Sequence, residues 1–95
     1  MLIDDYVCDV LMRDLVGHDR QPTSFLVYLY LAYEIGRSKR ERVQVSYQNL
    51  AHAVGVSKSA AQSAVRWLVK RKLLESRKDS PTGVPIYRVL RPWRN

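Results

Sequence analysis

Several polar side chains in the segment 57–71 have the types and the spacing needed to hydrogen-bond nucleic acid. They lie mainly three and four residues apart, which gathers them on one side of a helix: Lys58, Ser59, Gln62, Ser63 and Arg66. Glutamine can pair with adenine, arginine or lysine with guanine or phosphate, and serine with either base edges or phosphate. A helix that carries such residues outward fits the major groove of duplex DNA.

Two helices joined by a tight turn would hold this polar face in position. Ser46 and Ser57 are suitable N-caps for helices over 47–54 and about 58–71. Gly55 suits the left-handed residue that ends the first of them. The apolar and small residues that we expect to face inward are Leu50, Ala51, Val54, Val56, Ala61, Ala64 or Val65, Leu68 and Val69.

Further helices precede this pair, and short strands flank it. Regularly spaced apolar residues predict a helix over 3–16, stopped by Gly17: Ile3, Val7, Val10, Leu11 and Leu15. A second, almost wholly apolar helix covers about 23–36 and ends at Gly36. Short strands are expected at 43–45, 74–78 and 85–90, the last two flanking the turn-rich loop 79–84.

The charge is divided unequally along the 95 residues. The net charge is +7. Residues 1–36 hold two basic and six acidic residues (net −4), 37–78 hold eleven and two (net +9), and 79–95 hold three and one (net +2). A basic segment attracts a polyanion, although it can equally be a solvated surface. Within it, the run 37–42 (RSKRER) is either a flexible exposed linker or a phosphate contact beside the groove.

At residues 50–75 the chain resembles a known family. The order LAHAVGVSKSAAQSAVRWLVKRKLLE, followed by two strands around a loop, is similar to bacterial winged helix-turn-helix DNA-binding regulators of the GntR-like and MarR-like kind. The resemblance covers about residues 22–90. It departs from the family at Lys72, where such sequences often carry glycine before the Leu-Leu pair.

This resemblance implies one mainly α domain with a small β-hairpin: an N-terminal helical extension (1–21), a winged-helix core (22–90) and a tail (91–95). Helix 57–71 would be the recognition helix, and the loop 78–85 would be the wing, near a minor groove or the DNA backbone. The DNA-binding residues expected from the resemblance are Ser57, Lys58, Ser59, Gln62, Ser63, Arg66, Arg77, Lys78 and Thr82.

The expected function is sequence-specific binding of double-stranded DNA by a transcriptional regulator that occupies its operator. The apolar N-terminal helices favour a homodimer on inverted half-sites. A replication or plasmid- and phage-maintenance factor would use the same chemistry. A winged helix that binds another protein is the other alternative, which the charge of Lys58, Arg66, Lys70 and Arg71 disfavours.

Other chemistry finds little support in the sequence. No catalytic constellation, phosphate-binding glycine loop or metal-ligand spacing stands out, so we expect neither an enzyme nor a cofactor. No run of about 20 apolar residues and no signal-peptide pattern occurs, which favours a cytoplasmic protein without a membrane partner.

Four further expectations concern single side chains. Cys8 should be a small buried residue. Trp67 and Trp93 should pack on the hairpin. Asp4, with the other aspartates of the first helix, should form a solvated face.

Overall fold

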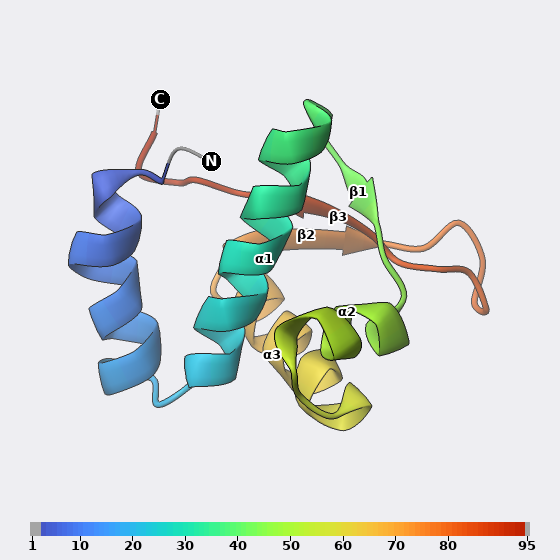
Figure 1. Cartoon of the computed structure of the whole chain (residues 1–95), viewed down its shortest axis with the longest axis horizontal. Helices are drawn as coiled ribbons and strands as arrows, with labels where there is room; N and C mark the ends of the chain where they lie inside the picture. The colour runs from blue at the N-terminus through green and yellow to red at the C-terminus, as the bar shows by residue number, and fades with distance from the viewer. Residues whose placement is uncertain (1–2, 95) are drawn as a thin grey trace.

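The computed structural model describes residues 3–94, in which helices pack beside a small sheet (Figure 1). In chain order the elements are η1 (Val7–Leu11), η2 (Arg13–His18), α1 (Pro22–Ser38), β1 (Val43–Gln44), α2 (Tyr47–Val54), α3 (Lys58–Lys70), β2 (Leu74–Arg77) and β3 (Ile86–Val89). The prediction of a mainly helical chain is confirmed, and the predicted small β-hairpin, formed by β2 and β3, belongs to a three-stranded antiparallel sheet. None of the described helices is long and apolar enough to span a membrane.

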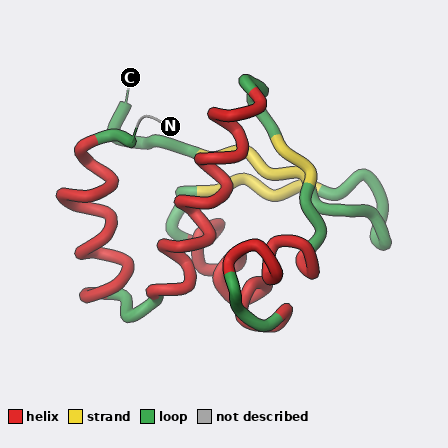
Figure 2. The backbone as a smooth tube through the Cα atoms, in the orientation of Figure 1, coloured by secondary structure: helices red, strands yellow, loops and turns green. Residues whose placement is uncertain are grey.

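The sheet has the strand order β1-β3-β2, with both pairings antiparallel (Figure 2). Because side chains alternate along a strand, Leu74, Tyr87 and Val89 point inward and are buried. Glu75 stands opposite Arg88 in the register and shares the outer face with it. One face of the sheet therefore closes the core, and the other is polar and solvated.

Helix α1 runs through the centre of the molecule and contacts every layer of it. Ser24, fully buried near its start, donates a hydrogen bond from Oγ to the carbonyl of Ala64 in α3 (3.3 Å). One turn later, the hydroxyl of Tyr28 donates to the carbonyl of Leu90 beyond the sheet (3.0 Å). Burial raises the pKa of Tyr28 to about 12, so this hydroxyl stays a donor. These two bonds tie α1 to α3 and to the end of β3.

The N-terminal helix, made up of η1 and η2, is wider than an α-helix. Its backbone bonds span five residues, as from the amide of Met12 to the carbonyl of Val7 and from Asp19 to Asp14. Three of the predicted stripe residues (Val7, Leu11 and Leu15) are buried against the rest of the chain. These stripe residues are thus buried by contacts within one chain.

The expected helix stops at Gly17 and Gly36 were wrong. Helix η2 continues to His18, and α1 continues to Ser38 before Lys39 adopts a left-handed conformation (φ 57°). Backbone hydrogen bonding and tertiary packing outweigh the modest cost of a glycine inside a helix, about 1 kcal/mol.

The caps of the helix pair are confirmed. Ser46 Oγ accepts from the amide of Asn49 (3.0 Å), and Ser57 Oγ accepts from Ala60 (3.1 Å). Gly55 has φ 87°, the left-handed conformation that its position requires. Lys72 also has positive φ (59°), a conformation that glycine adopts at lower cost than lysine.

Several expectations about single side chains were wrong. Cys8 is exposed, because the stripe that faces the core passes through Val7 and Leu11. Val69, expected inward, is 42% exposed.

Trp93 packs on the N-terminal helix and not on the hairpin. It stacks on Tyr6 (ring centroids 4.4 Å apart) and donates from Nε1 to Asp4 (3.2 Å). Arg94 and Arg91 also pair with Asp4. Asp4 therefore holds the C-terminal segment, and is not part of a merely solvated face.

Gly55→Ala should lower the free energy of unfolding by about 1 kcal/mol, because alanine tolerates φ 87° poorly. Gly36→Ala is the matched control. It lies inside α1, where an added methyl group meets nothing within 4 Å, and should raise the free energy of unfolding by about 1 kcal/mol. Urea denaturation of both variants measures the difference, and equal effects would contradict the assignment of the turn.

Candidate nucleic-acid interface

Helix α3 has one buried and one exposed face, and most of the predicted contact residues lie on the exposed one. Its buried residues are Ala61, Ala64, Val65 and Leu68. The exposed predicted residues are Ser57, Lys58, Ser59, Ser63 and Arg66, and Gln62 is half-buried. Periodic burial thus separates a packing face from a polar face that can hydrogen-bond a ligand.

Two contacts organise this polar face. Arg66 donates from its guanidinium group to Ser63 Oγ (3.2 Å), and the hydroxyl groups of Ser57 and Ser59 lie 3.2 Å apart. The bond from Arg66 restrains a long side chain without neutralising its charge. Its remaining donors stay free for a base edge or a phosphate.

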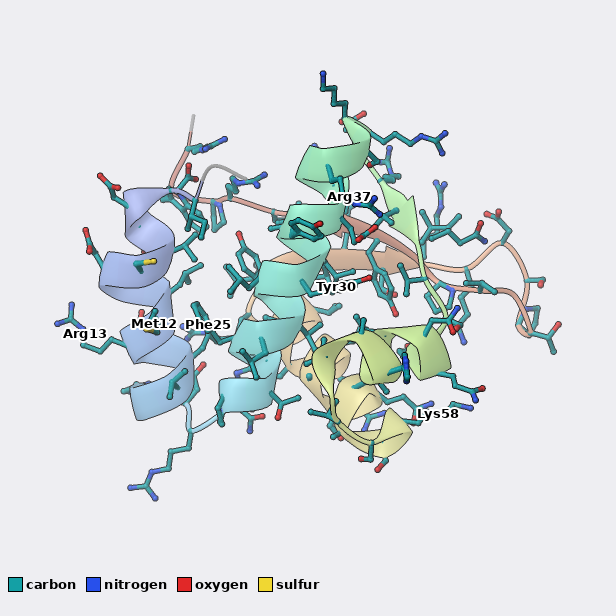
Figure 3. The ribbon with its side chains drawn as sticks, in the orientation of Figure 1. Met12, Arg13, Phe25, Tyr30, Arg37 and Lys58 are labelled. Atoms are coloured by element: carbon teal, nitrogen blue, oxygen red, sulfur yellow. The ribbon has the colours of Figure 1, made fainter. Side chains whose placement is uncertain are left out.

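A cleft of about 190 Å³ joins the start of α3 to the loop 78–85. Its walls come from α2, α3 and the hairpin loop: Ser46, Tyr47, Gln48, Lys58, Lys78, Thr82, Gly83, Val84 and Pro85. Lys58, labelled in Figure 3, enters it from α3. The Nζ of Lys78 lies 5.6 Å from the centre of the Tyr47 ring. The structure thereby brings together two cations that are 20 positions apart in the sequence.

Sequence reasoning missed Tyr47 and Gln48 as members of this cleft. A signal was present, because both directly follow the N-cap Ser46 and so stand at the exposed start of α2. Their approach to the hairpin loop, however, depends on the sheet, which no local pattern encodes.

Arg77 does not join the cleft, although the sequence grouped it with Lys78 and Thr82. Neighbouring residues of a strand point to opposite faces. Arg77 lies on the outer face of the sheet, around a shallow hollow with Arg42 and Arg88. The predicted wing residues are therefore divided between two surfaces.

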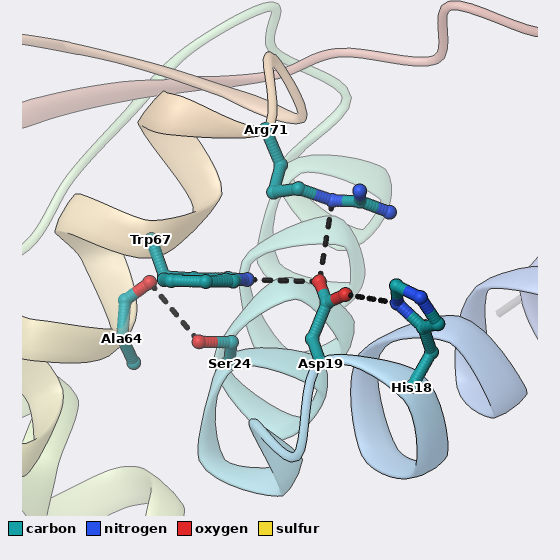
Figure 4. A network of polar contacts seen from close by, with 6 residues as sticks. All are labelled: His18, Asp19, Ser24, Ala64, Trp67 and Arg71. Atoms are coloured by element: carbon teal, nitrogen blue, oxygen red, sulfur yellow. Dashed lines mark hydrogen bonds and ion pairs between the residues drawn. The ribbon is translucent and has the colours of Figure 1, made fainter.

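Arg71, the residue that caps the C-terminus of α3, is engaged within the molecule (Figure 4). Asp19, whose side chain is only 4% exposed, accepts from Trp67 Nε1 (2.9 Å) and from Arg71 Nε (3.2 Å). His18 Nδ1 lies 3.0 Å from the same carboxylate. The expectation that Trp67 packs on the hairpin was wrong, since its indole points to the N-terminal segment.

The surroundings of Asp19 favour its charged form. Burial opposes ionisation, but the hydrogen bonds from His18 and Trp67 and the positive charge of Arg71 outweigh it, so the pKa of Asp19 lies below its ordinary value. Asp19 is thus a stable anchor for the C-terminal half of α3. A single aspartate before Pro22 carries no sequence signal of this role.

The basic run 37–42, which covers the last residues of α1 and the loop after it, lies at the far end of α1 from α3. Ser24, near the start of α1, is bonded to α3. The 17 residues of α1 correspond to about 25 Å of helix. Figure 3 shows Arg37 and Lys58 well apart. Of the two interpretations of this run, the arrangement argues against the phosphate contact beside the same groove.

Other kinds of site find no support in the described residues. No group of three histidine, cysteine, aspartate or glutamate side chains in residues 3–94 could hold a metal ion. An apolar cavity of about 380 Å³ between α1 and α2 has no charged side chain in its lining, so it adds nothing to an anion site.

Comparison with known proteins found no matching family model, no matching curated protein and no matching solved structure. The function must therefore be inferred from the residues of this chain.

Asp19→Asn should lower the free energy of unfolding at pH 7 by about 1–2 kcal/mol, because Arg71 loses its buried counter-charge. The lowered pKa of Asp19 means that its stabilisation is present above its unfolded-state pKa, about 3.9, and is lost as the pH falls through the folded-state value. The gap between wild type and variant should accordingly close in acid. Asp9→Asn, at an exposed position, is the control. A gap that persists unchanged below pH 3 would contradict the role of the charge.

Proposed function

We propose that this chain is a winged helix-turn-helix protein that binds duplex DNA sequence-specifically and regulates transcription by occupying an operator. The observation that carries the proposal is the cleft in which Lys58, Lys78 and Thr82 converge beside the polar face of α3. Two cations from separate elements, next to a row of small hydrogen-bonding side chains, match the chemistry of a phosphate backbone flanking base edges.

In this proposal α3 enters the major groove with its first turns. Gln62 and Arg66 read base edges, while Ser57, Ser59 and Ser63 contact bases or phosphates. Lys58 and Lys78 neutralise phosphates on either side of the cleft, and the loop 78–85 acts as the wing. Arg71 contributes indirectly, because its pair with Asp19 holds the end of α3.

The proposal includes a cytoplasmic location and a homodimer on inverted half-sites, paired through the N-terminal helices. The buried stripe of these helices is already used within the chain, so pairing would rely on their outer side, where Met12 and Val16 are 42% and 40% exposed. A replication or plasmid- and phage-maintenance role would use the same surface.

Selection of bound duplexes from a random pool, at two salt concentrations, tests the proposal. Enrichment of one sequence supports specific recognition, and an inverted repeat supports the dimer. No enrichment at either salt concentration, with no duplex retained, would overturn DNA binding and favour a protein-binding winged helix.

Arg66→Ala should weaken binding to the selected sequence by roughly 1–3 kcal/mol if the arginine reads a base. Affinity for random duplex should change much less. Fluorescence anisotropy with both duplexes measures the ratio. Equal losses on the two duplexes would make Arg66 a phosphate contact instead.

Lys78→Ala should reduce the slope of log K against log salt concentration by about 0.9, the contribution of one phosphate contact. Arg77→Ala is the neighbouring control: its side chain lies on the other face of the sheet, so the slope for one duplex should not change. If both variants shift the slope equally, the division between the two surfaces is wrong.

A further inference from the structure

The outer face of the sheet and the adjoining loop form a second basic surface. We call it the sheet-side surface and define it by five cations: Lys39, Arg40, Arg42, Arg77 and Arg88. Arg42, Arg77 and Arg88 line one small hollow together with Glu75 and Ile86. The register supports this grouping, because Arg77 stands opposite Ile86 and Arg88 opposite Glu75. Lys39 and Arg40 precede Arg42 by three and two residues in the loop after α1.

The ion pairs on this surface are loose. Arg42 and Arg88 lie 3.9 and 3.8 Å from Glu41, and Arg88 lies 3.7 Å from Glu75. All four side chains are at least 40% exposed. Exposed pairs of this kind contribute little to stability. Their arginines can therefore exchange a carboxylate for a phosphate at small cost, unlike Arg71, which is tied to the buried Asp19.

Positive charge remains in excess after these pairs are counted. Five cations and two carboxylates leave the sheet-side surface with a net charge of +3. Among the described residues, Lys39, Arg40 and Arg77 have no ion pair. A surface with unpaired cations and only exposed counter-charges attracts a polyanion.

The sheet-side surface and the polar face of α3 look out on different sides of the molecule. The inner residues of the sheet and the buried face of α3 meet in one core, so their exposed faces point away from it. In Figure 1 the strands β2 and β3 pass behind α1 and extend to its right, while α3 lies below the sheet. The shortest extent of the molecule is 21 Å. One duplex would have to bend sharply to reach both faces, and duplex DNA is stiff over about 150 base pairs.

From this arrangement we infer that the sheet-side surface binds the phosphate backbone of a second duplex segment, so that one chain bridges two stretches of DNA. The inference rests on the proposed function, which supplies the first duplex. Binding at the second surface is independent of sequence, because contacts to phosphates carry no sequence information. It weakens steeply with salt, by roughly 40-fold between about 50 and 200 mM if three phosphates are neutralised.

Co-capture of two duplexes tests the inference. The selected duplex is fixed to beads, the full chain is added, and a labelled random duplex is then supplied at low salt. Wild type should retain the labelled duplex. Arg40→Gln/Arg42→Gln should bind the fixed duplex with unchanged affinity. The amount of labelled duplex that it retains should fall by about fivefold or more. Both positions are in an exposed loop, which keeps the fold intact.

Arg13→Gln/Arg20→Gln is the matched control, since it removes the same charge from exposed positions in the N-terminal segment. It should co-capture like wild type. Equal retention by wild type and the loop variant would overturn the inference and assign bridging to pairing between chains. Loss of affinity for the fixed duplex in the loop variant would mean that one duplex covers both surfaces. If wild type binds no duplex at all, the proposed function fails; if it binds one and never two, only the inference fails.

Discussion

The close approach of α3 to α1 sets the positions of the surrounding elements. Ala61 and Ala64 occupy the buried face of α3 with almost no exposure. Their small side chains let the backbone come near enough for Ser24 to bond the carbonyl of Ala64. A larger residue at either position would move α3 outward. Since the polar face is the other side of the same helix, its position relative to the hairpin loop depends on this contact.

The N-terminal segment also helps to hold α3 in position. An aspartate near each end accepts from a tryptophan indole: Asp4 from Trp93 and Asp19 from Trp67. Arginines from the same two segments complete each cluster. Thus the acidic first third of the chain neutralises part of the basic remainder, and it fixes α3 and the C-terminal segment at once.

The surroundings of each cation determine whether it is free to meet a ligand. Arg71 faces a carboxylate that is nearly excluded from water, where an ion pair is hard to break once formed. Lys70 lies 5.3 Å from the centre of the Trp67 ring. Lys58 and Lys78 line an open cleft. The basic segment that the sequence treats as one block is therefore divided into internal anchors, a set that lines the cleft and a sheet-side set.

Features under local control could be predicted from the residues alone: the caps at Ser46 and Ser57, the left-handed Gly55, the burial of Leu50, Ala61 and Leu68, and the strands around the loop 79–84. These follow from hydrogen bonds and periodicity within a few residues. The packing of distant segments set three other features: the face of the sheet that Arg77 takes relative to Lys78, the contact of Asp19 with Trp67, and the exposure of Cys8. Such outcomes depend on contacts between distant segments, as between Asp19 and Trp67, which are 48 positions apart, and no local pattern of residue types encodes the position of one segment relative to another.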